Sequence, residues 1–133
     1  MSKVIKLKKG LDIKLKGEAE NLVKSIEKCD FYAVKPTDFR LLTPKLAVKA
    51  GDQVKAGDVL FINKYRPEVK FTSPVSGTVE AVNRGERRKL LEVVVKADAQ
   101  IQYKDFGAAD VNKLSREEII EKLLDSGVWP MIT

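Results

Sequence analysis

The chain has 133 residues, 44% of them hydrophobic and 33% charged, which suits one compact domain that buries its own core. It contains no histidine and a single cysteine, Cys29, which excludes an internal disulfide, a catalytic triad built on imidazole, and an iron–sulfur cluster or structural zinc held by cysteines of this chain alone. The net charge of +6 leaves an anionic partner open, and the sequence has no apolar run of about 18 residues that would predict a transmembrane helix.

The first 44 residues predict a β-hairpin followed by a connecting segment. Apolar and polar residues alternate over 4–8 and again over 11–15, with Lys9-Gly10 as the turn between them. Residues 21–29 carry enough apolar positions for a weak helix or an irregular segment. Residues 31–44 are interrupted by prolines, and we expect a loop anchored by buried side chains, namely Phe31, Tyr32, Phe39, Leu41 and Leu42.

A tandem repeat opens the central part of the chain, which we assign to residues 45–96. The sequence VKAGD occupies 48–52 and recurs at 54–58. The glycine of each copy can adopt the positive φ of a tight turn, and the aspartate after it can accept hydrogen bonds from backbone amides of the turn. Each valine is expected to point inward. The repeat therefore predicts very short strands separated by sharp corners, followed by a strand at 59–62.

The second half of the central part continues this arrangement. A corner at 73–77 and a turn at 83–86 separate segments that alternate as strands. The strands are expected, in chain order, around 69–71, at 78–82 and at 90–95. Because such frequent corners disfavour a flat sheet, we expect two similar halves that meet around 63–68 and wrap around one core.

The clearest helix signal lies near the C-terminus, in a segment we assign to 97–133 as a linker and a helix. Ser115 and Glu118 have the spacing of a capping box. The helix is expected to end at Gly127 and to have one apolar face, formed by Ile119, Ile120, Leu123 and Leu124. The apolar segment 128–130 that follows indicates a further element, so we expect the chain to be a fragment of a longer polypeptide.

The sequence predicts no catalytic, cofactor-binding or metal site. Glycine-rich phosphate loops of the GxGxxG and GxxxxGK[ST] types are absent, and Cys29 has no histidine to activate it. The aspartates of the repeat stand at turn corners, where capping the turn is their expected role.

The most distinctive surface feature is a basic turn. Arg84, Arg87, Arg88 and Lys89 are opposed there only by Glu86, so the turn can bind an anionic partner or simply form a solvated face. The aromatic residues are not interleaved with these cations in a stacking pattern, so nucleic acid is not an expected partner. We predict an interaction surface that comprises Arg84, Glu86, Arg87, Arg88 and Trp129.

The repeat and the sequence SPVSGTV at 73–79 together resemble the biotinyl/lipoyl-carrier superfamily, whose two halves open with V-x-x-G-D and S-P-x-x-G-x-V motifs. The resemblance implies a barrel-sandwich hybrid, mainly β with minor α, flanked here by the N-terminal hairpin and the C-terminal helix. True carriers place their modified lysine on the hairpin between the halves, where Lys64 stands nearby. A lipoyl- or biotinyl-type carrier domain with Lys64 as acceptor is therefore an alternative function, although the Met-Lys-Met or Asp-Lys-Ala surroundings of carrier lysines are missing.

Further segments point to a branch that does not act as a carrier. They are KGLD at 9–12, VKPT at 34–37, AVNRGERR at 81–88, LSRE at 114–117 and LDSGVW at 124–129. With them, nearly the whole chain resembles the A subunit of the sodium-translocating NADH:quinone reductase. The combination of NRGERR with SGVW is far more specific than the SPVSGTV corner alone.

This second resemblance implies a respiratory complex that couples NADH oxidation and quinone reduction to sodium export. The complex uses NADH, flavins, an iron–sulfur cluster, quinone and sodium, and none of these is expected to be bound by this part of the A subunit. The implied partners are the other subunits of the pump, including membrane-embedded flavin-bearing ones, and quinone through the full-length subunit. The implied location is peripheral, on the cytoplasmic face of the bacterial inner membrane. A third interpretation is the related subunit of a ferredoxin:NAD reductase complex, which shares the half-barrel but continues into cysteine-rich cluster motifs.

Overall fold

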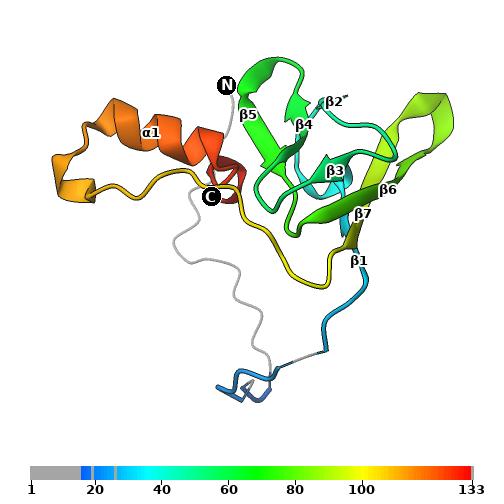
Figure 1. Ribbon diagram of the computed structural model, residues 1–133, viewed down its shortest axis with the longest axis horizontal. Helices are drawn as coiled ribbons and strands as arrows, with labels where there is room; N and C mark the ends of the chain where they lie inside the picture. Colours follow the sequence, from blue (N-terminus) through cyan, green and yellow to red (C-terminus); the bar gives the residue numbers. More distant parts are fainter. Residues whose placement is uncertain (1–15, 19, 26, 133) are drawn as a thin grey trace, which may run out of the picture.

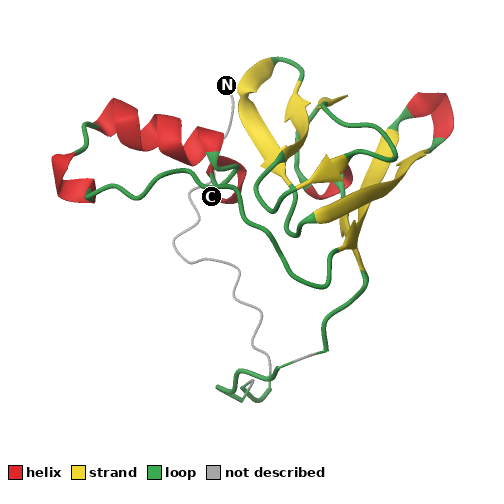
Figure 2. Ribbon diagram, viewed as in Figure 1, coloured by secondary structure: helices red, strands yellow, loops and turns green. Residues whose placement is uncertain are grey.

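The computed structural model describes residues 16–18, 20–25 and 27–132, and these form a mainly β fold with one α-helix (Figures 1 and 2). The mainly β fold class with a C-terminal helix is confirmed. The hairpin expected at the N-terminus falls almost entirely outside the described residues. Residues 20–25 and 27–30 form neither helix nor strand. Of the two predictions for 21–29, a weak helix or an irregular segment, the structure therefore agrees with the irregular segment.

Seven strands form two antiparallel sheets. The strands are β1 (Phe31–Val34), β2 (Pro44–Leu46), β3 (Gln53–Val54), β4 (Val59–Asn63), β5 (Arg66–Thr72), β6 (Gly77–Arg84) and β7 (Leu90–Ala97). One sheet has the order β1-β7-β6-β3 and the other has the order β2-β4-β5. The helices are η1 (Pro36–Asp38), η2 (Glu86–Arg88), η3 (Val111–Lys113), α1 (Arg116–Asp125) and η4 (Trp129–Met131), of which all but α1 are 3₁₀-helices.

Strand β1 corrects the prediction that residues 31–44 form a loop. Phe31–Val34 pairs antiparallel with β7, with Tyr32 opposite Val95 and Val34 opposite Val93. A four-residue apolar segment gives a weak local signal, and its strand state depends on a partner that is distant in the sequence. Two expected anchors are wrong, because Phe31 is 52% exposed and Leu41 is 99% exposed. The other three, Tyr32, Phe39 and Leu42, do pack against the core.

The two corners of the tandem repeat have the predicted geometry. Gly51 and Gly57 have φ values of 92° and 99°, and the carboxylates that follow accept backbone hydrogen bonds from Lys49 (2.9 Å) and Lys55 (2.8 Å). Each corner also joins the chain to another part of the fold: the amide of Gly51 donates to Val79 on β6, and the amide of Gly57 donates to Ser73. The repeat therefore bends the chain so that β3 belongs to one sheet and β4 to the other.

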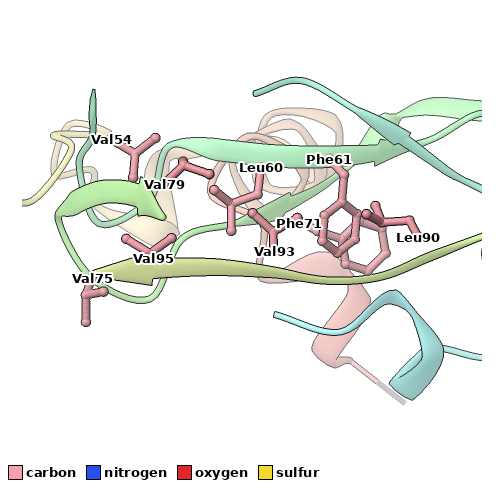
Figure 3. Close-up of a cluster of buried hydrophobic side chains, with 9 residues drawn as sticks. All are labelled: Val54, Leu60, Phe61, Phe71, Val75, Val79, Leu90, Val93 and Val95. Atoms are coloured by element: carbon pink, nitrogen blue, oxygen red, sulfur yellow. The ribbon is translucent and has the colours of Figure 1, made fainter. Parts of the chain in front are cut away.

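The core lies between the two sheets, and both contribute to it (Figure 3). Its buried members are Val54, Leu60, Phe61, Phe71, Val75, Val79, Leu90, Val93 and Val95. Phe61 stacks on Phe71 with ring centroids 4.9 Å apart, and Phe39 meets the edge of the same ring at 4.6 Å. This aromatic cluster joins β4, β5 and the loop after η1 into one hydrophobic unit.

The segment after β7 runs along the second corner of the repeat and the corner at 73–77 before it reaches α1. The amide of Gln102 donates to Oγ of Ser76 at 2.8 Å, and a short parallel bridge pairs Tyr103 with Ala56. The ring of Phe106 covers Gly57, where an added Cβ would lie 2.9 Å from Cε2 of the ring. The domain boundaries predicted at 44/45 and 96/97 stay predictions. Hydrogen bonds join residues on the two sides of each of these boundaries.

Helix α1 begins with the predicted capping box and packs against β5. The side chain of Ser115 accepts from the amide of Glu118, and the Glu118 carboxylate accepts from the amide of Ser115 at 2.7 Å. At the other end, Asp125 forms an ion pair with Lys70 of β5. Gly127 follows with φ of 73°, as predicted for the residue that ends the helix.

The ends of α1 make the stability of the domain sensitive to acid. Hydrogen bonds from the backbone and side chain of Ser115 lower the pKa of Glu118 below its ordinary 4.5, and the hydrogen bond from Lys70 lowers the pKa of Asp125 below its ordinary 3.8. A lowered carboxyl pKa stabilises the fold above the ordinary value, and that contribution is lost as the pH falls through the lower folded value. We therefore expect resistance to urea to decline below about pH 4. Asp125→Asn should flatten this decline in a pH series of urea titrations, and an unaltered slope would contradict the assignment.

Candidate docking surface

The basic turn forms the tip of the β6–β7 hairpin, which projects from the end of the molecule opposite α1 (Figure 1). The amide of Gly85 donates to the carbonyl of Lys89 at 2.9 Å, which closes the tip around η2. The guanidinium of Arg84 donates to the carbonyl of Arg88 at 3.0 Å, so one predicted residue positions another. The tip side chains are all exposed, and they carry four positive charges against the one carboxylate of Glu86.

The backbone of this tip is strained. Arg87 and Arg88 have φ values of 53° and 60°, in the left-handed region that residues with a side chain avoid at a cost of about 1–2 kcal/mol each. Strained conformations of this kind concentrate at binding and catalytic sites, where the surrounding structure maintains them. The hydrogen bonds of Gly85 and Arg84 supply that support here.

A groove of about 570 Å³ separates the hairpin from the loop that follows β1. The loop contributes residues 36–37 and 39–44 to the lining of the groove, and the hairpin contributes Arg84, Arg88, Lys89 and Leu90. Two predicted site residues, Arg84 and Arg88, thus line a concave surface. No acidic residue lines it within the described part of the chain.

Trp129 lies elsewhere. It begins η4, which packs against β5, and its side chain is 37% exposed. The neighbouring Pro130 lines a second hollow of about 440 Å³ with residues of the loop after η1, but Trp129 does not line the groove beside the hairpin. The structure therefore brings the predicted arginines together and leaves Trp129 apart from them.

Sequence reasoning missed two residues of this surface, Arg40 and Leu41. Leu41 has φ of 59° and projects into solvent, where a buried anchor was predicted. No motif marks either residue, and the approach of the loop to the hairpin depends on the pairing of β1 with β7. The only available signal was charge, since Arg40 is the one cation among residues 36–44.

Lys64 occupies the tip of the other hairpin, between β4 and β5. Lys64 and Tyr65 are the two turn residues, and the side chain of Asn63 accepts from the amide of Tyr65 at 3.1 Å. The ammonium group of Lys64 lies 5.9 Å from the centre of the Tyr65 ring, and both side chains are exposed. The lysine thus stands at the hairpin between the two halves.

Three further findings concern the described residues only. They contain no group of three or more acidic, cysteine or histidine side chains that could hold a metal ion. Every buried side-chain nitrogen or oxygen among them has a hydrogen-bond partner. None of their helices is long and apolar enough to cross a membrane.

Two curved antiparallel sheets, joined at glycine corners around one core and carrying exposed hairpins, define a barrel-sandwich hybrid. A family model described as the NqrA N-terminal barrel-sandwich hybrid domain matches residues 5–98. The chain therefore belongs to the NqrA N-terminal domain family.

Curated relatives agree with this assignment. The A subunit of the Na(+)-translocating NADH-quinone reductase from Yersinia pseudotuberculosis is 40% identical over 128 residues, which cover 95% of this chain and 29% of the relative. The proteins of the same name from Hahella chejuensis and Haemophilus influenzae are each 38% identical over the same shares of the two chains. The chain spans about 29% of the length of the relatives it matches.

Proposed function

We propose that this chain is a docking domain of the A subunit of a sodium-translocating NADH:quinone reductase and that it carries no catalytic centre of its own. The observation that carries the proposal is the β6–β7 hairpin, whose exposed cationic tip is held in a strained backbone conformation. Membership of the family gives the context, because the relatives bear the name of that component of the reductase. The barrel supplies a rigid base, and the hairpin supplies the contact.

The partners in this proposal are the other subunits of the pump, including membrane-embedded subunits that bear flavin. The complex would use NADH, flavins, an iron–sulfur cluster, quinone and sodium, and these would be bound outside the residues described here. The domain would sit on the cytoplasmic face of the inner membrane as a peripheral part of the complex. Trp129 is proposed as a second contact, because a partly exposed tryptophan offers a large amphipathic surface to a neighbouring element.

Charge reversal at the hairpin tip tests the proposal. We expect Arg87→Glu combined with Arg88→Glu to reduce assembly of the full-length protein into the complex several-fold, because like charges would face an acidic partner. The melting temperature should change little, since both side chains are exposed. Assembly is measured by the amount of complex recovered with a tagged partner protein of the pump.

A matched control changes the net charge equally at another place. Lys113→Glu with Arg116→Glu alters two side chains that are 83% and 82% exposed near the start of α1. This variant should assemble like the unaltered protein. If the hairpin variant also assembles normally, Arg87 and Arg88 are a solvated face and the proposal fails for this surface.

A further inference from the structure

Backbone strain is concentrated around the groove between the β6–β7 hairpin and the loop after η1. Among the described residues, three that are not glycine have positive φ, namely Leu41, Arg87 and Arg88. Leu41, from the loop, and Arg88, from the hairpin, both line the groove, and Arg87 precedes Arg88 in the chain. The strain is therefore confined to one place that two distant stretches of sequence build together, as is usual for binding sites.

The groove is lined by four cationic side chains. Arg40 contributes from the loop, and Arg84, Arg88 and Lys89 contribute from the hairpin. None of these four cations forms a salt bridge with a carboxylate of the described residues. Three carboxylates occur close by in the sequence: Glu86 is on the tip, Asp38 lines the adjacent hollow, and Glu92 accepts from Asn83 at 2.8 Å. Among the residues that the structure describes, these groove cations therefore have no carboxylate within salt-bridge distance.

The same groove also offers apolar contact. Phe39, Leu42 and Leu90 line it as part of the core or packed against it. Above them Leu41 is 99% exposed, so a strained conformation presents an apolar side chain to solvent. The left-handed backbone of this leucine lowers stability, and its exposed side chain contributes no burial free energy to folding. A partner that covers the side chain would gain that burial free energy on binding.

We infer that this groove binds an extended segment of a partner polypeptide in which carboxylates flank an apolar side chain. The carboxylates would face Arg40, Arg84 and Arg88, and the apolar side chain would meet Leu41 and the apolar lining, namely Phe39, Leu42 and Leu90. A flat lipid surface would meet the projecting tip and could not reach this apolar lining, so a polypeptide is the occupant that fits a concave site. The inference rests on the proposed docking function and specifies its partner.

Binding to a defined probe tests the inference. The isotope-labelled chain is titrated with a short synthetic peptide in which glutamates flank one leucine, with its counterpart in which lysines replace the glutamates, and with vesicles containing phosphatidylserine. We expect only the glutamate peptide to shift the amide resonances of Leu41 and Arg88 in a saturable way. Added salt should weaken this binding, because surface charges are screened.

Two variants and one control show which residues of the groove bind the peptide. Arg40→Glu with Arg88→Glu should weaken peptide binding about tenfold or more, which is the loss of two charge contacts. Leu41→Asn should weaken it several-fold without lowering the melting temperature, since asparagine tolerates the left-handed conformation. Lys113→Glu with Arg116→Glu carries the same change of net charge and should bind the peptide unaltered.

Three outcomes would overturn the inference: no shift at Leu41 and Arg88, equal weakening in the control variant, or vesicles that shift the same amides in place of the peptide. The result is separable from the proposed function. If the Arg40 and Arg88 variant loses the peptide but enters the complex normally, the groove is not the docking site while the domain still docks. If the peptide binds as expected but the chain never enters the complex, the proposed function is wrong, while the inference that the groove binds a peptide still holds.

Discussion

Replacing Gly77 with alanine should destabilise the domain by about 3 kcal/mol or more, enough to unfold much of it. Gly77 begins β6 directly after the SPVS corner, and it lies against the backbone of β7. A Cβ built there would stand 1.9 Å from the carbonyl oxygen of Lys96. Since the obstacle is the backbone of a paired strand, relief requires the two strands to separate. Chemical denaturation followed by circular dichroism measures the loss.

Gly51→Ala is the comparison that separates crowding from backbone strain. Gly51 has φ of 92°, but an added Cβ would have nothing within 4 Å. Its substitution should cost only the strain of a left-handed residue, about 1–2 kcal/mol. If Gly77→Ala proves no worse than Gly51→Ala, the close approach of β6 to β7 is not what requires glycine at this position.

Phe61→Ala should cost about 3–5 kcal/mol, because it removes the largest fully buried side chain of the core. The ring is fully shielded from solvent and stacks on Phe71, so its removal leaves a cavity at the junction of β4 and β5. Phe31→Ala removes the same atoms from a side chain that is 52% exposed, and it should cost about 1 kcal/mol or less. Equal losses in the two variants, measured by thermal unfolding, would contradict the position of the core in Figure 3.

Local signals in the sequence predicted the parts of the fold that local chemistry determines. The VKAGD corners, the strand after them and the capping box of α1 all have the expected form, because a glycine, an aspartate or a serine at a given spacing acts on its own turn. The alternation of apolar residues likewise predicted strands that the structure shows as β6 and β7. These elements together predicted a wrapped, mainly β fold, and the resemblance to carrier domains specified the barrel-sandwich hybrid.

The features that depend on distant partners could not be predicted in the same way. Strand β1 exists because β7 offers an edge to it, and nothing within Phe31–Val34 indicates that pairing. The exposure of Leu41 depends on a left-handed backbone conformation that a leucine does not favour. The arginines of the hairpin were identified from their charge, whereas the groove they share with the loop became visible only in three dimensions. The contact of Trp129 with a partner stays a prediction.

The domain is a barrel-sandwich hybrid that has a strained, cationic surface at one end. The hairpin between β4 and β5 carries Lys64. The hairpin between β6 and β7 carries the strained backbone of Arg87 and Arg88 together with the concentrated positive charge. The strained backbone lowers the folding stability of a small domain. Because the strained residues lie at or beside one groove, the pattern is consistent with selection for binding rather than for stability. A docking role explains this arrangement without a reaction centre.

Co-purification of the full-length protein tests the central claim most directly. The protein carrying this domain is tagged in its native host, recovered from mild detergent extracts of the membrane, and separated on a denaturing gel that is inspected for flavin fluorescence. The proposed docking function predicts that a flavin-bearing membrane protein is recovered with the unaltered form and with the Lys113→Glu, Arg116→Glu control, but several-fold less with the Arg87→Glu, Arg88→Glu variant. Recovery of the tagged protein without any flavin-bearing partner would contradict it.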